Sequence, residues 1–223
     1  MVLSFNKIYI DGGKTVNEIS LKYYKRKSFN SAVYSKNIEM LKNIEFKKND
    51  TFIDIGAHRG EEIDFLVETG CTIYSFECNP LHIENLKSIY GDHENVKIIN
   101  ALVTNIDNKD IRCFWKNTSK GGSMSEEESK INSSKEYIFV KSLLLSRYII
   151  ENDIKNIKAI KMDVEGSEFK IIEDLIDTGV INVVPVIFYE DHTNKITDRD
   201  WHIHKDSVIK KMSNYKNKFK KWY

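Results

Sequence analysis

Short apolar runs alternate with amphipathic helical patterns along most of the chain after residue 50. Buried strands are expected at five of these runs, namely Thr51–Asp54, Thr72–Phe76, Val96–Ile99, Ile157–Met162 and Val183–Phe188. Helices are expected between or before them, over Glu61–Glu68, Leu81–Tyr90, Leu143–Asn152 and Ser167–Asp177. Strands that alternate with helices predict an α/β fold with a mostly parallel central sheet flanked by helices.

The first 50 residues follow a different pattern. A short strand is expected at Ile8–Ile10, and helical patterns run over Thr15–Lys25 and Tyr34–Asn43. We therefore expect residues 1–50 to form an N-terminal helical segment and residues 51–223 to form the main domain. The segment could cap a ligand site, or it could simply pack on the sheet.

Residues 105–140 are irregular. Strands are expected at Ile111–Trp115 and Tyr137–Val140, with a polar loop between them that carries Gly121 and Gly122. A long polar loop inside a compact domain often has a function. This loop could close over a substrate, or it could be an ordinary surface loop.

Composition narrows the class of protein. At 223 residues, 41% hydrophobic and 30% charged, the chain can form one globular domain with a full core. The formal net charge is +1, so electrostatics give no reason to expect nucleic acid as the main partner. There is no secretion signal pattern and no apolar run long enough to span a membrane. The three cysteines (Cys71, Cys78 and Cys113) form no C-x-x-C pair and suit a reduced, cytoplasmic location.

The stretch Thr51–Pro80 carries the clearest chemical signal. A strand leads into Asp54, a turn with Gly56 and Gly60 follows, and after a helix the next strand ends at Glu77. Glycines let the backbone turn tightly beside a ligand, and an acid about 20 residues further on can accept hydrogen bonds from ribose hydroxyls. This order is typical of the nucleoside-binding half of a Rossmann-like fold.

The spacing of the glycines indicates which nucleoside is bound. The turn reads G-x-x-x-G, and the chain contains no G-x-G-x-x-G. A dinucleotide needs the middle glycine so that its pyrophosphate can approach the backbone, whereas a nucleoside with an amino-acid tail does not. The pattern therefore favours S-adenosylmethionine over NAD.

Polar or acidic side chains end all five predicted core strands. They are Asp54, Glu77, Asn100, Asp163 with Glu165, and Glu190 with His192. In open parallel sheets, ligands bind at the carboxyl ends of the strands. Because several acids brought together without a purpose would repel one another, we expect these ends to form the functional site.

The segments FIDIGAHRG, YSFECNP, INALV, IKMDVEGSEFKIIEDL and FYEDH, in this order, resemble the FkbM-type family of S-adenosylmethionine-dependent methyltransferases. The resemblance covers roughly Phe52–His192, and its most specific part is D-V-E-G-S-E at Asp163–Glu168. It implies a class I Rossmann-like fold and transfer of a methyl group to a hydroxyl. Acceptors in such families are commonly carbohydrates, glycans, glycolipids or polyketide-like metabolites.

The resemblance also implies roles for individual residues. The methionine tail of the cofactor would be surrounded by Asp54, Gly56, Ala57 and Gly60. The nucleoside would be bound by Glu77, Cys78 and Asn79 at the ribose and by Asn100, Ala101 and Leu102 at the adenine. The sulfonium and the acceptor would lie near Asp163 and Glu165, with Glu190 and His192 completing the acceptor side.

The chain departs from the family pattern in two places. His58 stands where such families often have Asn. The stretch after His192 is short for a helix followed by the usual antiparallel hairpin, so the terminal hairpin could be reduced.

A hydroxyl acceptor requires a base, because an alcohol is a poor nucleophile until its proton is removed. His192 is the first candidate, since the pKa of a free histidine lies near neutrality. Asp163 or Glu165 is the second, and could act if burial raised its pKa. A structural role for His192, paired with Glu190, remains open.

Metal binding is compatible with the sequence but not required by it. Asp163, Glu165 and Glu190 could supply oxygen ligands to Mg²⁺. His202 and His204 more simply belong to a surface helix than to a transition-metal site. The lysine- and aromatic-rich stretch Lys205–Tyr223 could contact nucleic acid or a membrane surface, or form a solvated helix and edge strand with its aromatic rings inside.

Two other functions remain open. An RNA ribose methyltransferase would need a strongly basic groove, which the net charge does not indicate. A non-catalytic Rossmann-like module that binds a nucleoside or a protein would use Glu77 but leave Asp163, Glu165 and His192 without a role.

Overall fold

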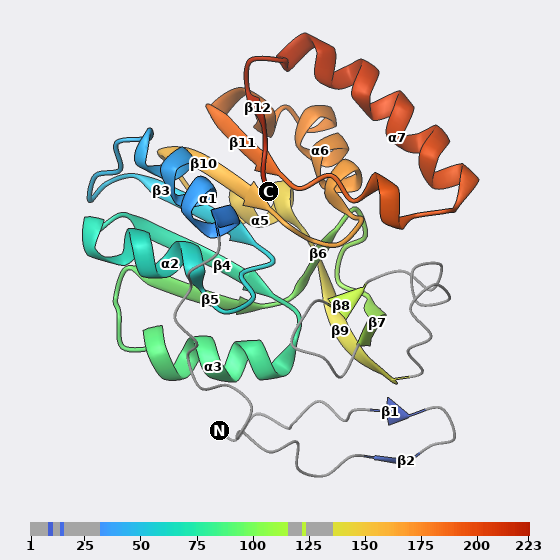
Figure 1. Ribbon diagram of the computed structural model, residues 1–223, viewed down its shortest axis with the longest axis horizontal. Coiled ribbons are helices and arrows are strands. Elements are labelled where there is room, and N and C mark those ends of the chain that lie inside the picture. The colour runs from blue at the N-terminus through green and yellow to red at the C-terminus, as the bar shows by residue number, and fades with distance from the viewer. Residues whose placement is uncertain (1–8, 11–13, 16–31, 116–121, 124–135) are drawn as a thin grey trace.

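The computed structural model describes residues 9–10, 14–15, 32–115, 122–123 and 136–223 (Figure 1). Its main sheet has six strands in the order β12-β11-β10-β3-β4-β5, and every neighbouring pair is parallel. The strands are β3 (Thr51–Ile55), β4 (Thr72–Glu77), β5 (Val96–Asn100), β10 (Ile157–Met162), β11 (Val186–Tyr189) and β12 (Phe219–Lys221). The predicted α/β fold with a parallel central sheet is confirmed.

Helices cover both faces of this sheet. They are α1 (Ala32–Lys42), α2 (Glu61–Leu66), α3 (Pro80–Tyr90), α5 (Leu145–Glu151), α6 (Glu168–Asp177) and α7 (Arg199–Met212). Short 3₁₀ turns follow or precede them at Val67–Thr69, Val180–Val183, Thr193–Lys195 and Ser213–Tyr215. Within the part of the chain that the structure describes, no helix is both long and apolar enough to cross a membrane.

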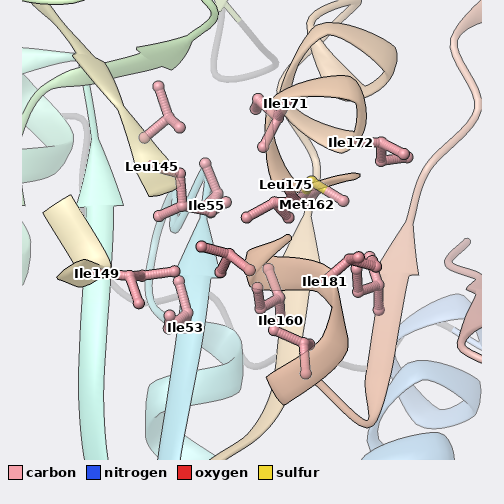
Figure 2. Close-up of a cluster of buried hydrophobic side chains, with 14 of the residues drawn as sticks. Ile53, Ile55, Leu145, Ile149, Ile160, Met162, Ile171, Ile172, Leu175 and Ile181 are labelled. Carbon is pink, nitrogen blue, oxygen red and sulfur yellow. The ribbon is translucent and has the colours of Figure 1, made fainter. Parts of the chain in front are cut away.

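The period-two alternation of the strands divides the core into two clusters. Ile53 and Ile55 of β3 and Ile160 of β10 face α5 and α6, as Figure 2 shows. Phe52 of β3 and Ala159 of β10 face the other way, into a cluster that includes residues of α1, α2 and α3. The helix α1 thus packs on the main sheet, through the buried Ile38 and Leu41.

A smaller second sheet lies beside the first (Figure 1). Its strands are β1 (Tyr9–Ile10), β2 (Lys14–Thr15), β6 (Leu102–Thr104), β7 (Asp110–Trp115), β8 (Gly122–Ser123) and β9 (Glu136–Leu144). β7 and β9 confirm the strands predicted in the irregular region. The predicted helix start at Leu143 is wrong, because β9 continues to Leu144 in a parallel pairing with β6. The helix predicted over Thr15–Lys25 lies outside the described residues apart from Thr15, as does the polar loop apart from Gly122–Ser123.

The last strand that the structure describes, β12, lies at the edge of the main sheet. It pairs in parallel with β11. Trp222 is buried against Phe188, with ring centroids 5.2 Å apart, and the backbone N–H of Tyr223 donates to Asn37 of α1. Trp222 agrees with the expectation of an edge strand whose aromatic rings turn inward, whereas Tyr223 is 42% exposed.

Candidate functional site

The strand order places a topological switch point between β3 and β10. From β3 the chain continues outward to β4 and β5, and then returns to β10 on the other side of β3. The loops after β3 and β10 touch at this point, where the backbone N–H of Asp163 donates to the carbonyl of Ile55 at 3.0 Å. In open α/β sheets, ligands bind at such a point, beyond the carboxyl ends of the strands.

Gly56 makes this contact between the loops sterically feasible. Its φ of +79° is unfavourable for other residues, and a Cβ atom there would lie 1.9 Å from the carbonyl oxygen of Asp163. The backbone N–H groups of Gly56 and Ala57 both donate to the carbonyl of Phe76, which ties the turn to β4. Gly60, at φ +83°, leaves room for the ring of Tyr90.

Glu77, at the end of β4, is held by the glycine turn and by its own chain neighbours. One carboxylate oxygen accepts from the backbone N–H of His58 at 2.8 Å, and the other accepts from those of Cys78 and Asn79 at 2.9 and 2.7 Å. Burial by itself would raise the pKa of Glu77, but His82 and these N–H groups lower it below its usual value. Glu77 is therefore charged at neutral pH.

The predicted adenine-side residues lie next to Glu77. Asn100 is its partner in register on β5, and the side-chain amide of Asn100 donates to the carbonyl of Glu77 at 3.1 Å. The N–H of Ala101 donates to the same carbonyl, and Ala101 and Leu102 are buried. The structure thus brings these predicted residues together.

His58 has a positive φ of 49° and lies near two acids, Glu77 and Glu61. Its ring packs edge-on against that of His82 with centroids 4.3 Å apart, and its Nδ1 lies 3.7 Å from a carboxylate oxygen of Glu61. The ring of His58 thus packs between the glycine turn and α3.

Asp54 lies beside a buried lysine. It is the penultimate residue of β3, fully buried, and stands beside Lys161 of β10 in register. The Lys161 ammonium lies 3.2 Å from Asp54 and 3.9 Å from Glu62, and donates to the carbonyl of Gly56 at 2.8 Å. Because side chains alternate along a strand, Asp54 lies on the same face of β3 as Phe52. Its contact with the methionine tail of the cofactor stays a prediction.

The buried side chains of Asp54, Glu62 and Lys161 shift one another's pKa values. Burial raises the pKa of Asp54 and raises that of Glu62 to about 8, although Lys161 opposes both shifts. Burial would lower the pKa of Lys161, but the two carboxylates raise it above its usual value. The ammonium therefore stays charged and links β10 to the glycine turn.

The four residues predicted for the acceptor side lie together. His192 follows β11 and is buried, and its Nε2 atom lies 3.3 Å from Glu190, 3.4 Å from Glu165 and 3.7 Å from Asp163. The carboxylates are about one-third exposed, whereas His192 is 1% exposed. We call these four residues the acidic cluster.

Glu168 is a site residue that sequence reasoning missed. This fully buried carboxylate lies 2.7 Å from Nδ1 of His192 and accepts from the backbone N–H groups of Val164 and Gly166 at 3.1 and 3.0 Å. The sequence held one indication of its role, because Glu168 is the last residue of the D-V-E-G-S-E stretch. Glu168 shapes the turn after β10 and fixes the ring of His192.

The electrostatics of the acidic cluster separate the candidate bases. Burial would lower the pKa of His192, but the carboxylates of Glu168 and Glu190 raise it to about 11. Burial raises the pKa of Asp163 to about 6, while the nearness of His192 lowers that of Glu190. With these carboxylates around it, His192 keeps its proton at neutral pH. Asp163 is therefore better placed than His192 to accept a proton.

The other candidate histidines lie apart from the acidic cluster. His202 and His204 are in α7, where Nε2 of His202 lies 2.7 Å from the carbonyl of Ile196 and Nε2 of His204 lies 2.6 Å from Glu173. Their place in a helix on the outside of α6 agrees with the simpler expectation for this pair. Among the described residues, the donor atoms of Asp163, Glu165 and His192 come within 4.8 Å of one another, as metal ligands do.

Comparisons with known proteins agree with this geometry. Residues 54–219 match the model of the methyltransferase FkbM domain. No curated protein matches the chain.

Two of the solved structures that match this chain are also methyltransferases by name. The methyltransferase FkbM from Methylobacillus flagellatus KT is 13% identical with a TM-score of 0.47, and the match covers 82% of this chain but only 40% of that one. A precorrin-6y C5,15-methyltransferase from Geobacter metallireducens GS-15 is 10% identical with a TM-score of 0.44, covering 89% of this chain and 79% of that one.

Proposed function

The chain belongs to the FkbM family of methyltransferases, and on this premise we propose that it is an S-adenosylmethionine-dependent O-methyltransferase. We further propose that its acceptor is a hydroxyl of a carbohydrate, a glycan or a similar small metabolite. One observation carries the proposal. At the switch point of the sheet, the glycine turn that is hydrogen-bonded to Glu77 lies directly beside the acidic cluster, because Gly56 lies close to Asp163.

The cofactor side is formed by the ends of β3, β4 and β5. S-adenosylmethionine supplies a methyl group on a positively charged sulfur. Gly56, Ala57 and Gly60 would lie along its methionine tail, Asn100, Ala101 and Leu102 along its adenine, and Glu77, Cys78 and Asn79 at its ribose. Three backbone N–H groups hold the carboxylate of Glu77, and a ribose hydroxyl would donate to it beside His82, whose Nδ1 lies 3.7 Å from Oε2.

The acidic cluster is suited to the acceptor side. In the proposed reaction an acceptor oxygen forms a bond to the methyl carbon, the carbon–sulfur bond breaks with its electron pair left on sulfur, and the oxygen's proton passes to a carboxylate. Asp163 is the carboxylate of choice, because burial raises its pKa to about 6. His192, held by Glu168, keeps the neighbouring carboxylates in position.

The charge of the acidic cluster favours a neutral acceptor. Carboxylates accept hydrogen bonds from hydroxyl groups, which sugars present in number. They repel phosphates, so Asp163, Glu165 and Glu190 would disfavour an RNA backbone at this edge of the sheet. A non-catalytic module gives no reason for three carboxylates around one buried histidine.

A labelled-methyl assay tests the proposal. The full chain is incubated with S-adenosylmethionine carrying a tritiated methyl group and with separate panels of sugars, glycans and RNA. We expect label in a carbohydrate or similar hydroxylated metabolite, and loss of most turnover in Asp163→Asn with cofactor binding retained. The matched control is Asp206→Asn, an exposed position in α7. Label only in RNA, or full turnover in Asp163→Asn, would contradict the proposed acceptor or the proposed base.

A further inference from the structure

We propose that Asp163, Glu165 and His192 bind a divalent first-row transition-metal cation, such as Mn²⁺ or Zn²⁺. The two acids follow β10, and the histidine follows the neighbouring parallel strand β11. Their donor atoms lie within 4.8 Å of one another. The site would therefore join two adjacent strand ends at the open edge of the sheet.

The distances within this triad suit a shared cation. Nε2 of His192 lies 3.4 Å from Glu165 and 3.7 Å from Asp163. Two ligand atoms that are each about 2.1 Å from one metal ion are separated by roughly 3–3.5 Å. Small side-chain adjustments would bring the three donors to that spacing.

The buried nitrogen of His192 supplies an independent sign of a missing ligand. His192 is 1% exposed, and its Nε2 atom makes no hydrogen bond with any residue that the structure describes. A buried polar atom left without a hydrogen bond costs on the order of 1–3 kcal/mol. Nε2 is directed at three carboxylates, so a cation held among them would also satisfy the nitrogen.

The other ring nitrogen of His192, Nδ1, is held by a carboxylate, as is common in histidines that bind a metal. Nδ1 of His192 lies 2.7 Å from Glu168, which the backbone N–H groups of Val164 and Gly166 hold in place. A histidine that binds a metal through one nitrogen usually donates its other N–H to a carboxylate or carbonyl, which fixes the tautomer and the ring orientation. Glu168 gives His192 this arrangement, and a cation that bound at Nε2 would displace the proton from that nitrogen.

The charge and the chemistry of the donors point to the class of cation. Lys195 reaches Glu165 at 2.9 Å, but Asp163 and Glu190 add two further carboxylates around Nε2. One nitrogen and two or more oxygens suit Mn²⁺, Fe²⁺ or Zn²⁺, whereas Mg²⁺ and Ca²⁺ take oxygen ligands. We therefore expect Mg²⁺ to bind more weakly than Mn²⁺.

The role of the cation, though not its binding, rests on the proposed function. An acceptor hydroxyl bound to a divalent ion loses its proton more readily. Asp163 would then act as a ligand, and Glu190, which is outside the triad, would be the carboxylate that receives the proton. With the cation bound, Glu190 thus replaces Asp163 as the carboxylate that accepts the proton.

Metal titration of the full chain tests the inference. After treatment with a chelator and desalting, Mn²⁺ binding is followed by the loss of the free-ion electron paramagnetic resonance signal, with Zn²⁺ and Mg²⁺ as competitors. We expect one Mn²⁺ per chain, displaced by Zn²⁺ far more readily than by Mg²⁺. Asp163→Asn and Glu165→Gln, both at partly exposed positions, should weaken binding about 10-fold or more, and Glu168→Gln about 10–100-fold.

His204→Gln is the matched control, because it removes another histidine–glutamate pair outside the acidic cluster. It should leave Mn²⁺ affinity unchanged. Absence of binding to the wild-type chain, or equal binding by folded Asp163→Asn and Glu165→Gln, would overturn the inference. Metal binding without methyl transfer would refute only the proposed function, whereas methyl transfer at full rate in chelator would refute the role of the cation.

Discussion

The Nδ1 atom of His192 lies 2.7 Å from Oε1 of Glu168, and both side chains are buried. This pair connects the turn after β10 to the segment after β11. Because Glu168 is also bound to the backbone of that turn, the ring of His192 is held in one orientation. The edge of the sheet that we assign to the acceptor depends on this pair for its geometry.

Neutralising Glu168 should release the proton that it helps to hold on His192. Hydrogen bonding to Glu168 is the largest of the effects that raise the pKa of His192 to about 11. In Glu168→Gln we expect a clearly lower pKa for His192, measured by nitrogen chemical shifts of the imidazole across a pH titration in metal-free buffer. Glu173→Gln, which alters the partner of His204 and Lys211 and lies outside the acidic cluster, should leave the pKa of His192 unchanged. Equal His192 titrations in both variants would refute the coupling.

Removing the Lys161 ammonium should destabilise the fold strongly. Lys161→Met leaves Asp54 buried without its cation, and the loss of one partner of a buried ion pair costs about 3–5 kcal/mol. The measurement is the free energy of unfolding in urea. Lys158→Met, on the same strand but partly exposed, should change it by about 0.5 kcal/mol or less. Similar values for the two variants would contradict a structural role for the buried cation.

Two glycines with similar backbone angles should respond differently to alanine. Gly56 and Gly70 have φ of +79° and +73°, so each Gly→Ala change costs about 1–2 kcal/mol from the backbone alone. A Cβ at Gly56 also meets the Asp163 carbonyl at 1.9 Å, whereas at Gly70 the nearest atom is 3.8 Å away. We expect Gly56→Ala to be the more destabilised in thermal unfolding and to lose cofactor affinity. Retained affinity in a folded Gly56→Ala chain would argue against the switch point as the cofactor site.

The buried carboxyl of Glu62 should make stability fall with rising pH. Its pKa is about 8 in the folded chain against an ordinary value of 4.5, so between these values the folded state binds the extra proton. The contribution is complete below about pH 4.5 and is lost as pH rises through about 8. Urea unfolding at several pH values should show that Glu62→Gln gains stability relative to wild type over this range. A constant difference between the two chains would show that Glu62 does not titrate in this way.

The sequence was sufficient for the site's framework because strand ends carry a local signal. The glycine turn, Glu77 and the acids after β10 and β11 all follow short apolar runs, and parallel strands bring their carboxyl ends to one edge. Asn100 beside Glu77 followed from the same reasoning.

Contacts between distant segments were not predictable in this way. Lys161 lies in an apolar strand pattern, and its pairing with Asp54 depends on β10 lying next to β3, which periodicity does not reveal. The partner of Glu168 likewise comes from the segment after another strand. β6 has only three residues and is stabilised by its pairing with β9, so neither its existence nor the extension of β9 had a local signal.

The most direct test of the central claim is calorimetric titration of the full chain with S-adenosylhomocysteine and, separately, with NAD. We expect S-adenosylhomocysteine to bind the wild-type chain and Glu84→Ala, an exposed position in α3, with equal affinity. Binding should be lost in Glu77→Ala, with circular dichroism confirming that this variant is folded. NAD should not bind. Binding of NAD alone, or equal binding of S-adenosylhomocysteine by Glu77→Ala and wild type, would contradict the assignment of this edge of the sheet as an S-adenosylmethionine site.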